Sequence, residues 1–270
     1  EGDPRSSVFS YAAVIDNQSQ DTIFIPGRDA SVLGSSFVTL PAASSLHGVG
    51  GAFFHSDVTV TNLDVSATNF ALDFRCLAGT CGATAQSLLL DPGQSHLFED
   101  LVGTTFASPE SGGAVEVVGR APFVVTSRLY TPSHPDPTVG MFVPGLGPGD
   151  AAPAAVLTSL SYSADPTKGF RVNVGAFNRA DAARTVTFRL FSAAGEPLGQ
   201  TAQTLLGHEA LQLNDIFGML GVHTDVLGAY CLVDADGFGA LYPYAAVIDN
   251  QSQDPIFVTG QNDPEPPAVP

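Results

Sequence analysis

The stretch YAAVIDNQSQD occupies residues 11–21 and returns, letter for letter, at residues 244–254. Each copy starts with a strand-like run of Ala, Val and Ile, passes through a polar turn, and is followed by a second apolar run. Two apolar runs separated by Asn, Gln, Ser and Asp are typical of a β-hairpin. Eleven consecutive identities in distant segments indicate an internal repeat, so the fold is best sought in repeated units.

A weaker repeat relates two longer bodies of the chain. Six segments of the first body recur in the same order in the second, which indicates one shared fold. In Thr185–Phe191, polar and apolar residues alternate, so Val186, Phe188 and Leu190 should share one face of a strand. The matching segments are 55–62 and 171–178, 69–76 and 185–192, 85–90 and 202–207, 96–103 and 211–218, 113–119 and 228–234, and 141–145 and 256–260.

The composition favours an all-β protein. Only 14% of the 270 residues are charged, while Gly and Pro number 28 and 20, which is typical of short strands joined by turns. The net charge of −17 would repel DNA, RNA and anionic lipid, so we expect no nucleic-acid partner. No apolar stretch is long enough for a transmembrane helix, so we expect no membrane insertion.

Together these patterns predict two tandem immunoglobulin-like β-sandwiches preceded by an extra N-terminal β-hairpin. The predicted parts are the hairpin at 1–30, the sandwiches at 31–147 and 148–262, and a Pro-rich tail at 263–270. Residues Pro144–Asp150 should form a short linker between the sandwiches. Asp100 and Asp215 recur in both bodies, each in a single helical turn that crosses between sheets, and we expect them to cap that turn.

Residues 28–260 resemble the paired immunoglobulin-like repeats of secreted, multi-domain bacterial proteins. Those repeats typically end in a Tyr-Ala-x-Val-x-Asp-Asn segment followed by a Phe-Ile-Pro-like strand. Here the pattern runs from Tyr244 to Phe257, and again from Tyr11 to Pro26. The resemblance implies an extracellular or cell-surface location and a modular role, and it carries no catalytic residues.

The residue types that carry chemistry favour a protein that is not an enzyme. None of the six histidines has a metal-binding partner at the right spacing, and no nucleophile elbow or phosphate loop is present. His96 and His208 should lie at the surface, and Cys231 should be buried. We therefore expect no catalytic residues, no metal site and no cofactor. Calcium is the weaker alternative, because the loop 16–21 and its twin are rich in oxygen ligands but lack the acidic alternation of calcium loops.

Two covalent modifications are suggested by spacing. Cys76 and Cys81 flank a short turn, which predicts a disulfide and an oxidising compartment; two free thiols are the alternative. Asn17 and Asn250 each begin an Asn-Gln-Ser triplet, which matches the N-glycosylation acceptor pattern.

The N-terminal hairpin is surplus, because closing hairpins near 8–26, 124–144 and 239–259 serve only two bodies. An isolated hairpin is marginal in water and tends to recruit another sheet. It could exchange strands with the second sandwich of a neighbouring copy, it could be the remnant of a longer array, or it could fold back on its own chain. The residues concerned are Val8, Tyr11, Ala13, Ile15, Ile23, Phe24 and Ile25, with Tyr244, Ala246, Ile248, Ile256 and Phe257 in the C-terminal copy.

The leading hypothesis is an extracellular structural subunit that assembles with itself, head to tail, into a fibre or surface array by strand exchange of this hairpin. The alternative is a non-catalytic binding or spacer module cut from a larger secreted protein, contacting carbohydrate or a cell surface. The absence of Trp, a frequent platform for sugars, counts against carbohydrate.

Overall fold

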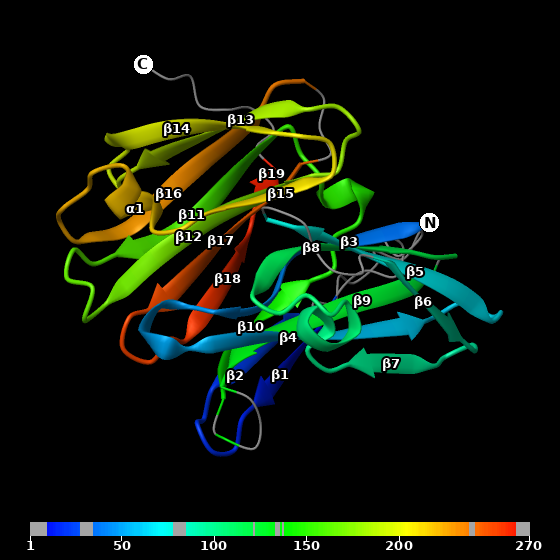
Figure 1. Cartoon of the computed structure of the whole chain (residues 1–270). Coiled ribbons are helices and arrows are strands. Elements are labelled where there is room, and N and C mark those ends of the chain that lie inside the picture. Colours follow the sequence, from blue (N-terminus) through cyan, green and yellow to red (C-terminus); the bar gives the residue numbers. More distant parts are fainter. Residues whose placement is uncertain are drawn as a thin grey trace, which may run out of the picture.

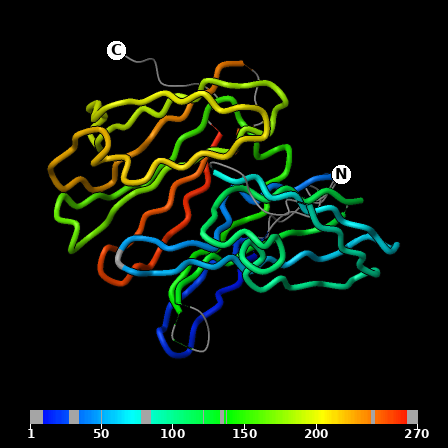
Figure 2. The backbone as a smooth tube through the Cα atoms, viewed as in Figure 1, coloured from blue at the N-terminus to red at the C-terminus, as the bar shows by residue number. Residues whose placement is uncertain are grey.

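The computed structural model describes residues 10–27, 35–77, 85–120, 122–132, 136, 138–237 and 241–262. All of its sheets are antiparallel, and Figure 1 shows two β-rich bodies with a separate hairpin beside the lower one. This hairpin consists of β1 (Tyr11–Ile15) and β2 (Thr22–Pro26). The tube in Figure 2 shows its two strands, in dark blue, at the lower edge of the molecule, near the lower ends of the orange and red strands.

The first body, here called module 1, comprises β3 to β10. One sheet has the strand order β6-β5-β8-β3 and the other has β7-β4-β9-β10. The long strand β3 joins them, since it pairs with β8 along Phe37–Ser45 and with β4 at Leu46 and His47. The elements are β3 (Phe37–His47), η2 (Val49–Gly51), β4 (Phe53–Asn62), β5 (Thr68–Cys76), β6 (Ala85–Leu90), β7 (Ser95–Phe98), η3 (Leu101–Thr105), β8 (Ser111–Val118), β9 (Phe123–Thr131) and β10 (Val139–Pro144).

The second body, module 2, comprises β11 to β19. Its sheets have the orders β14-β13-β16-β11-β19 and β15-β12-β17-β18. The elements are β11 (Ala154–Tyr162), β12 (Phe170–Asn178), β13 (Arg184–Phe191), β14 (Pro197–Leu205), β15 (Glu209–Leu213), α1 (Ile216–Met219), β16 (Val226–Ala235), β17 (Leu241–Asp249), β18 (Pro255–Thr259) and β19 (Gln261–Asn262), with η4 (Pro148–Asp150) before them.

Apart from β19, which has no counterpart among the described residues of module 1, both modules use the same strand order, so β4 corresponds to β12, β9 to β17 and β10 to β18. The pairs β4–β7 and β5–β8 also occur in immunoglobulin domains, where the sixth strand lies beside the seventh. Here the sixth strand, β8, lies beside β3, and β9 lies beside β4. The all-β prediction is confirmed, but the strand order differs from the immunoglobulin one, because strand number and spacing do not determine which strands become neighbours.

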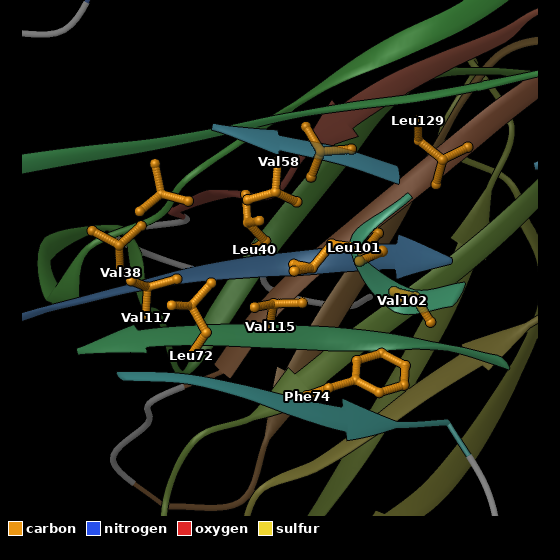
Figure 3. Close-up of a cluster of buried hydrophobic side chains, with 14 of the residues drawn as sticks. Val38, Leu40, Val58, Leu72, Phe74, Leu101, Val102, Val115, Val117 and Leu129 are labelled. Carbon is orange, nitrogen blue, oxygen red and sulfur yellow. The ribbon is translucent and has the colours of Figure 1, made fainter. Parts of the chain in front are cut away.

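The alternating pattern of the strands produces the two cores. Val186, Phe188 and Leu190 are buried on the inner face of β13, as their period-two spacing predicted. In module 1, Val58 and Val60 of β4 are buried in the same way. Figure 3 shows the side chains of this first core converging from both sheets, with Leu101 and Val102 of η3 closing one end.

The turns that cross between sheets are capped as the repeat predicted. The Asp100 carboxylate accepts a hydrogen bond from the Gly103 N–H at 3.3 Å, and Asp215 accepts one from Gly218 at 3.2 Å. Both aspartates adopt left-handed backbone, with φ of 44° and 46°. Their recurrence therefore reflects a structural requirement of the turn and gives no support to acid–base catalysis.

The connection between the modules, which was predicted as a short linker, is packed against both of them. Leu146 is buried together with Phe177 and Tyr242 of module 2, and it pairs with Thr39 of β3. The Tyr242 hydroxyl donates to the Gly147 carbonyl at 3.2 Å, and burial raises the pKa of Tyr242 to about 12. The segment packs because both modules present apolar side chains to it, which composition alone does not reveal.

A buried carboxylate reinforces this contact. Glu116 of β8 lies 3.1 Å from the Arg75 guanidinium and 3.0 Å from that of Arg179 in module 2. His208, which was expected at the surface, bridges Glu116 at 3.2 Å and Asp181 at 3.0 Å. His208 does lie next to the start of a strand, as the pattern predicted. Because module 1 faces this strand, the side chain of His208 takes part in the contact between the modules.

Candidate assembly surface

The two copies of the repeated sequence form hairpins with the same internal geometry. Tyr11 stacks on Phe24 with ring centroids 5.3 Å apart, and Tyr244 stacks on Phe257 at 5.5 Å. Both turns contain a glutamine with φ of 64°, at Gln20 and at its twin in the second loop. The eleven identical residues therefore determine the local conformation of the hairpin, wherever it lies in the molecule.

The surroundings of the two copies are opposite. Tyr11 is 71% exposed, whereas Tyr244 is 2% exposed. Ile15 is 52% exposed, whereas Ile248 is 5% exposed. β17 is a central strand whose two faces contact the two modules, while β1 pairs only with β2 among the described residues. The same sequence is thus a buried strand near one end of the chain and an exposed strand near the other.

The N-terminal hairpin is attached to module 1 of its own chain through β2 and its loop. Ile23 is buried, and it lines a hollow together with Arg128 and Phe142 of the β9–β10 hairpin. In the loop, the Asp21 carboxylate accepts from the Gly140 N–H at 2.9 Å, and the Ser19 hydroxyl donates to the Thr138 carbonyl at 2.5 Å. This arrangement corresponds to the fold-back hypothesis, because the hairpin packs on its own chain by one face only.

A second carboxylate strengthens the loop contact. Asp16 accepts hydrogen bonds from the Thr138 N–H at 3.2 Å and from the Thr138 hydroxyl at 2.7 Å. Backbone N–H groups of Ser19 and Gln18 also donate to Asp16, and these hydrogen bonds hold its pKa well below the usual range. Asp21 lies 3.8 Å from the Arg128 guanidinium, yet desolvation raises its pKa. The loop is therefore held to β10 mainly by hydrogen bonds to charged oxygens.

The face of the C-terminal hairpin that carries Tyr244 and Ile248 is buried against module 1. Tyr244 and Ile248 belong to the same apolar cluster as Leu129 and Met141. The Tyr244 hydroxyl donates to the Gln212 side chain at 3.0 Å, and burial raises the pKa of Tyr244 above its ordinary value. Its ring lies over Gly175, where any Cβ would overlap it, so this glycine is required by close approach.

Each closing hairpin carries two adjacent cross-strand pairs, which point to opposite faces because side chains alternate along a strand. We call the pair on one face the inner pair and the pair on the opposite face the outer pair. The inner pairs are Val14–Ile23, Leu129–Met141 and Val247–Ile256. The outer pairs are Ala13–Phe24, Arg128–Phe142 and Ala246–Phe257.

The same contact between these pairs occurs twice in the molecule. The inner pair of β1–β2 lies over the outer pair of β9–β10, and all four side chains line one hollow. The inner pair of β9–β10 shares a cluster with the outer pair of β17–β18. In the same order, β2 lies beside β10 and β10 lies beside β18, as Figure 1 also shows. The three closing hairpins thus form a row with one repeated junction.

The sequence predicted three closing hairpins, but it did not predict the junction that repeats between them. The signal was available in the weaker repeat. The match of 141–145 with 256–260 aligns Met141 with Ile256 and Phe142 with Phe257, and so identifies β9–β10 as a third hairpin of the same kind. What the pattern could not indicate was that Arg128 and Phe142 receive the N-terminal hairpin.

A cleft of about 430 Å³ lies between the two modules. Its apolar wall includes Leu46 and Phe54, and its polar wall includes Arg171 and Gln212. The Arg171 guanidinium donates to the side-chain oxygens of Asn250 at 3.0 Å and Gln253 at 2.8 Å. Among the described residues, no group of three His, Cys, Asp or Glu side chains could hold a metal ion.

The remaining predicted residues are distributed as follows. Cys76 is disulfide-bonded and Cys231 is a buried free thiol, while Cys81 and Val8 lie outside the described residues. The two Asn-Gln-Ser sites differ, because Asn17 is exposed and Asn250 uses its side-chain amide to donate to the Lys168 carbonyl at 3.1 Å. Within the described part of the chain, no helix is long and apolar enough to span a membrane.

No protein-family model matches the chain, and no curated protein matches it. Solved structures with weak similarity come from infectious bursal disease virus. They include a mutant VP2 protein in T=1 particles, at 8% identity, with 93% of this chain and 72% of that chain covered and a TM-score of 0.19. They also include virus-derived T=1 particles, with the same identity and coverage and a TM-score of 0.20. The T13 viral particle is 10% identical, with 93% and 74% covered and a TM-score of 0.19.

Proposed function

We propose that this protein is a non-catalytic structural subunit that assembles with itself, head to tail, into an extracellular fibre or surface array. One observation carries the proposal: the junction between inner and outer pairs occurs twice within the chain. A contact that joins the front of one unit to the back of the next is heterologous, and a heterologous contact that does not close on itself continues as a filament. The repeat inside the chain thus supplies the geometry of the filament.

The assembly mechanism that we favour is stacking of faces and not exchange of strands. β17 lies between β12 and β18, and its ladder with β12 extends from Phe170 to Asn178. A hairpin from a second copy could enter that position only after this buried ladder had opened. Stacking leaves every hairpin in place and uses surfaces that are already exposed, so it has no such cost.

The extracellular location is supported by chemistry that is independent of the junction. Disulfides persist in oxidising compartments, and Cys76 is disulfide-bonded. The net charge of −17 would keep separate fibres apart by repulsion at low ionic strength. Neither the disulfide nor the net charge identifies a ligand, and self-assembly requires no ligand.

The test is the association state of the chain across concentration. Sedimentation velocity from low to high micromolar protein, with negative-stain microscopy of the same samples, should reveal species that grow with concentration and rods with a repeating unit. A single species at the mass of one chain throughout the range would contradict the proposal, and would favour the alternative of a binding or spacer module. Added salt up to physiological strength should promote growth, because it screens the acidic surface.

A further inference from the structure

Among the described residues, the row of three closing hairpins leaves one outer pair and one inner pair without a partner of the kind described above. At the N-terminal hairpin, Phe24 of the outer pair is 58% exposed. At the C-terminal hairpin, Ile256 of the inner pair is 60% exposed. These two pairs are the two halves of the junction that the chain forms twice internally. The outer half faces solvent in the described structure, whereas in the inner half Val247 is buried in the core of module 2 and Ile256 is the exposed member.

From this we infer that Ile256, the exposed member of the inner pair of β17–β18, docks on the outer face of β1–β2 in a second copy of the chain. The inference rests on the proposed function and specifies its contact surfaces. The occupant is a second copy because the internal junction shows which surface fits. The outer pair Ala246–Phe257 is covered by module 1, and the outer pair Ala13–Phe24 has the same residues in the same sequence.

The flanking residues support the same docking. In the internal junction, Tyr244 and Ile248 extend the outer pair along β17 and are buried with it. Their twins Tyr11 and Ile15 extend the outer pair of β1–β2 and are exposed. A face with this composition is the kind of apolar surface that marks a contact site, and its twin shows how it is buried when a module covers it.

Deleting the hairpin is not a clean test. Removal of residues 1–27 would uncover Arg128 and Phe142, which occupy the same ladder position and could receive the inner pair of another copy. Point substitutions avoid this problem, because they place a charge in one half of the junction and leave the row of hairpins intact. Phe24→Asp disables the outer half and Ile256→Asp disables the inner half. The matched control is Val65→Asp, at an apolar residue that is exposed elsewhere on module 1.

The experiment measures association of the full chain by sedimentation velocity, after circular dichroism has verified that every variant is folded. The unmodified chain and Val65→Asp should assemble equally. Phe24→Asp and Ile256→Asp should each raise the concentration needed for assembly at least tenfold. An equimolar mixture of these two variants should form dimers and nothing larger, because it contains one functional outer half and one functional inner half.

The outcomes separate the two proposals. Assembly of Phe24→Asp or Ile256→Asp at the concentration of the unmodified chain would overturn the inference about the surfaces, while self-assembly itself would stand. A mixture that stays monomeric would also overturn the inference. An unmodified chain that remains monomeric, together with Val65→Asp, would contradict the proposed function.

Discussion

Replacing Tyr244 with alanine should destabilise the protein far more than replacing Tyr11, although both residues begin the same eleven-residue sequence. Tyr244 is 2% exposed, and removal of a buried aromatic ring typically costs about 3–5 kcal/mol. Loss of its hydrogen bond to Gln212 adds about 1 kcal/mol. Tyr11 is 71% exposed and loses little more than its stacking on Phe24, which amounts to about 1 kcal/mol. The two variants should therefore differ by about 3 kcal/mol or more.

The assay is thermal and urea-induced unfolding of Tyr11→Ala and Tyr244→Ala, at concentrations where the unmodified chain is monomeric. For a chain of this size, about 3 kcal/mol corresponds to a difference in melting temperature of roughly 6–12 °C. The pair is internally controlled, because intrinsic strand propensity and local sequence are the same at both sites. Equal shifts in the two variants, or a larger shift for Tyr11→Ala, would refute the assignment of one copy as buried and the other as exposed.

Three further predictions concern the supporting structure. Gly175→Ala should cost about 1–3 kcal/mol, because a Cβ there would overlap the Tyr244 ring; an unchanged melting temperature would contradict the close approach. Asp100→Ala and Asp215→Ala should each cost about 0.5–2 kcal/mol through loss of the cap, and chemical denaturation that shows no loss in either would disprove the shared role. Asp254→Asn should stabilise the protein at pH 7 and flatten its pH dependence, since burial and nearby carboxylates raise the pKa of Asp254 from 3.8 to about 6. The stabilising contribution of the protonated form is complete below about pH 4 and is lost as pH rises through 6; it amounts to about 1 kcal/mol, because the carboxyl is only half-buried. Melting curves from pH 4 to pH 8 would reveal this, and parallel curves for the variant and the unmodified chain would contradict it.

Much of the local structure could be predicted from residue patterns. The alternation in Thr185–Phe191 located β13 and its buried face, because side-chain direction in a strand depends only on backbone geometry. The recurrence of Asp100 and Asp215 located the capped turns for a similar reason, since a cap is a contact between near neighbours in sequence. The order of the strands was not predictable, because it depends on pairing between segments that are remote in the chain.

The linker and His208 are two further features that depend on segments remote in the chain. Gly and Pro near Leu146 are equally compatible with a spacer and with a packed connection, and only the facing module makes it packed. His208 follows a turn in a polar context, which normally places a side chain in solvent. It becomes an interface residue because Glu116 of the other module is buried opposite it.

The candidate assembly surface has one property that could be predicted from the sequence and one that could not. By itself, the sequence determined that residues 11–26 and 244–259 form the same hairpin, down to the stacked rings and the turn conformation. Only the tertiary structure decided that one copy is buried between two modules while the other is exposed on one face. The physical reason is that hydrogen bonds and stacking within a hairpin are made by its own residues, whereas burial depends on the residues that other parts of the chain bring against it.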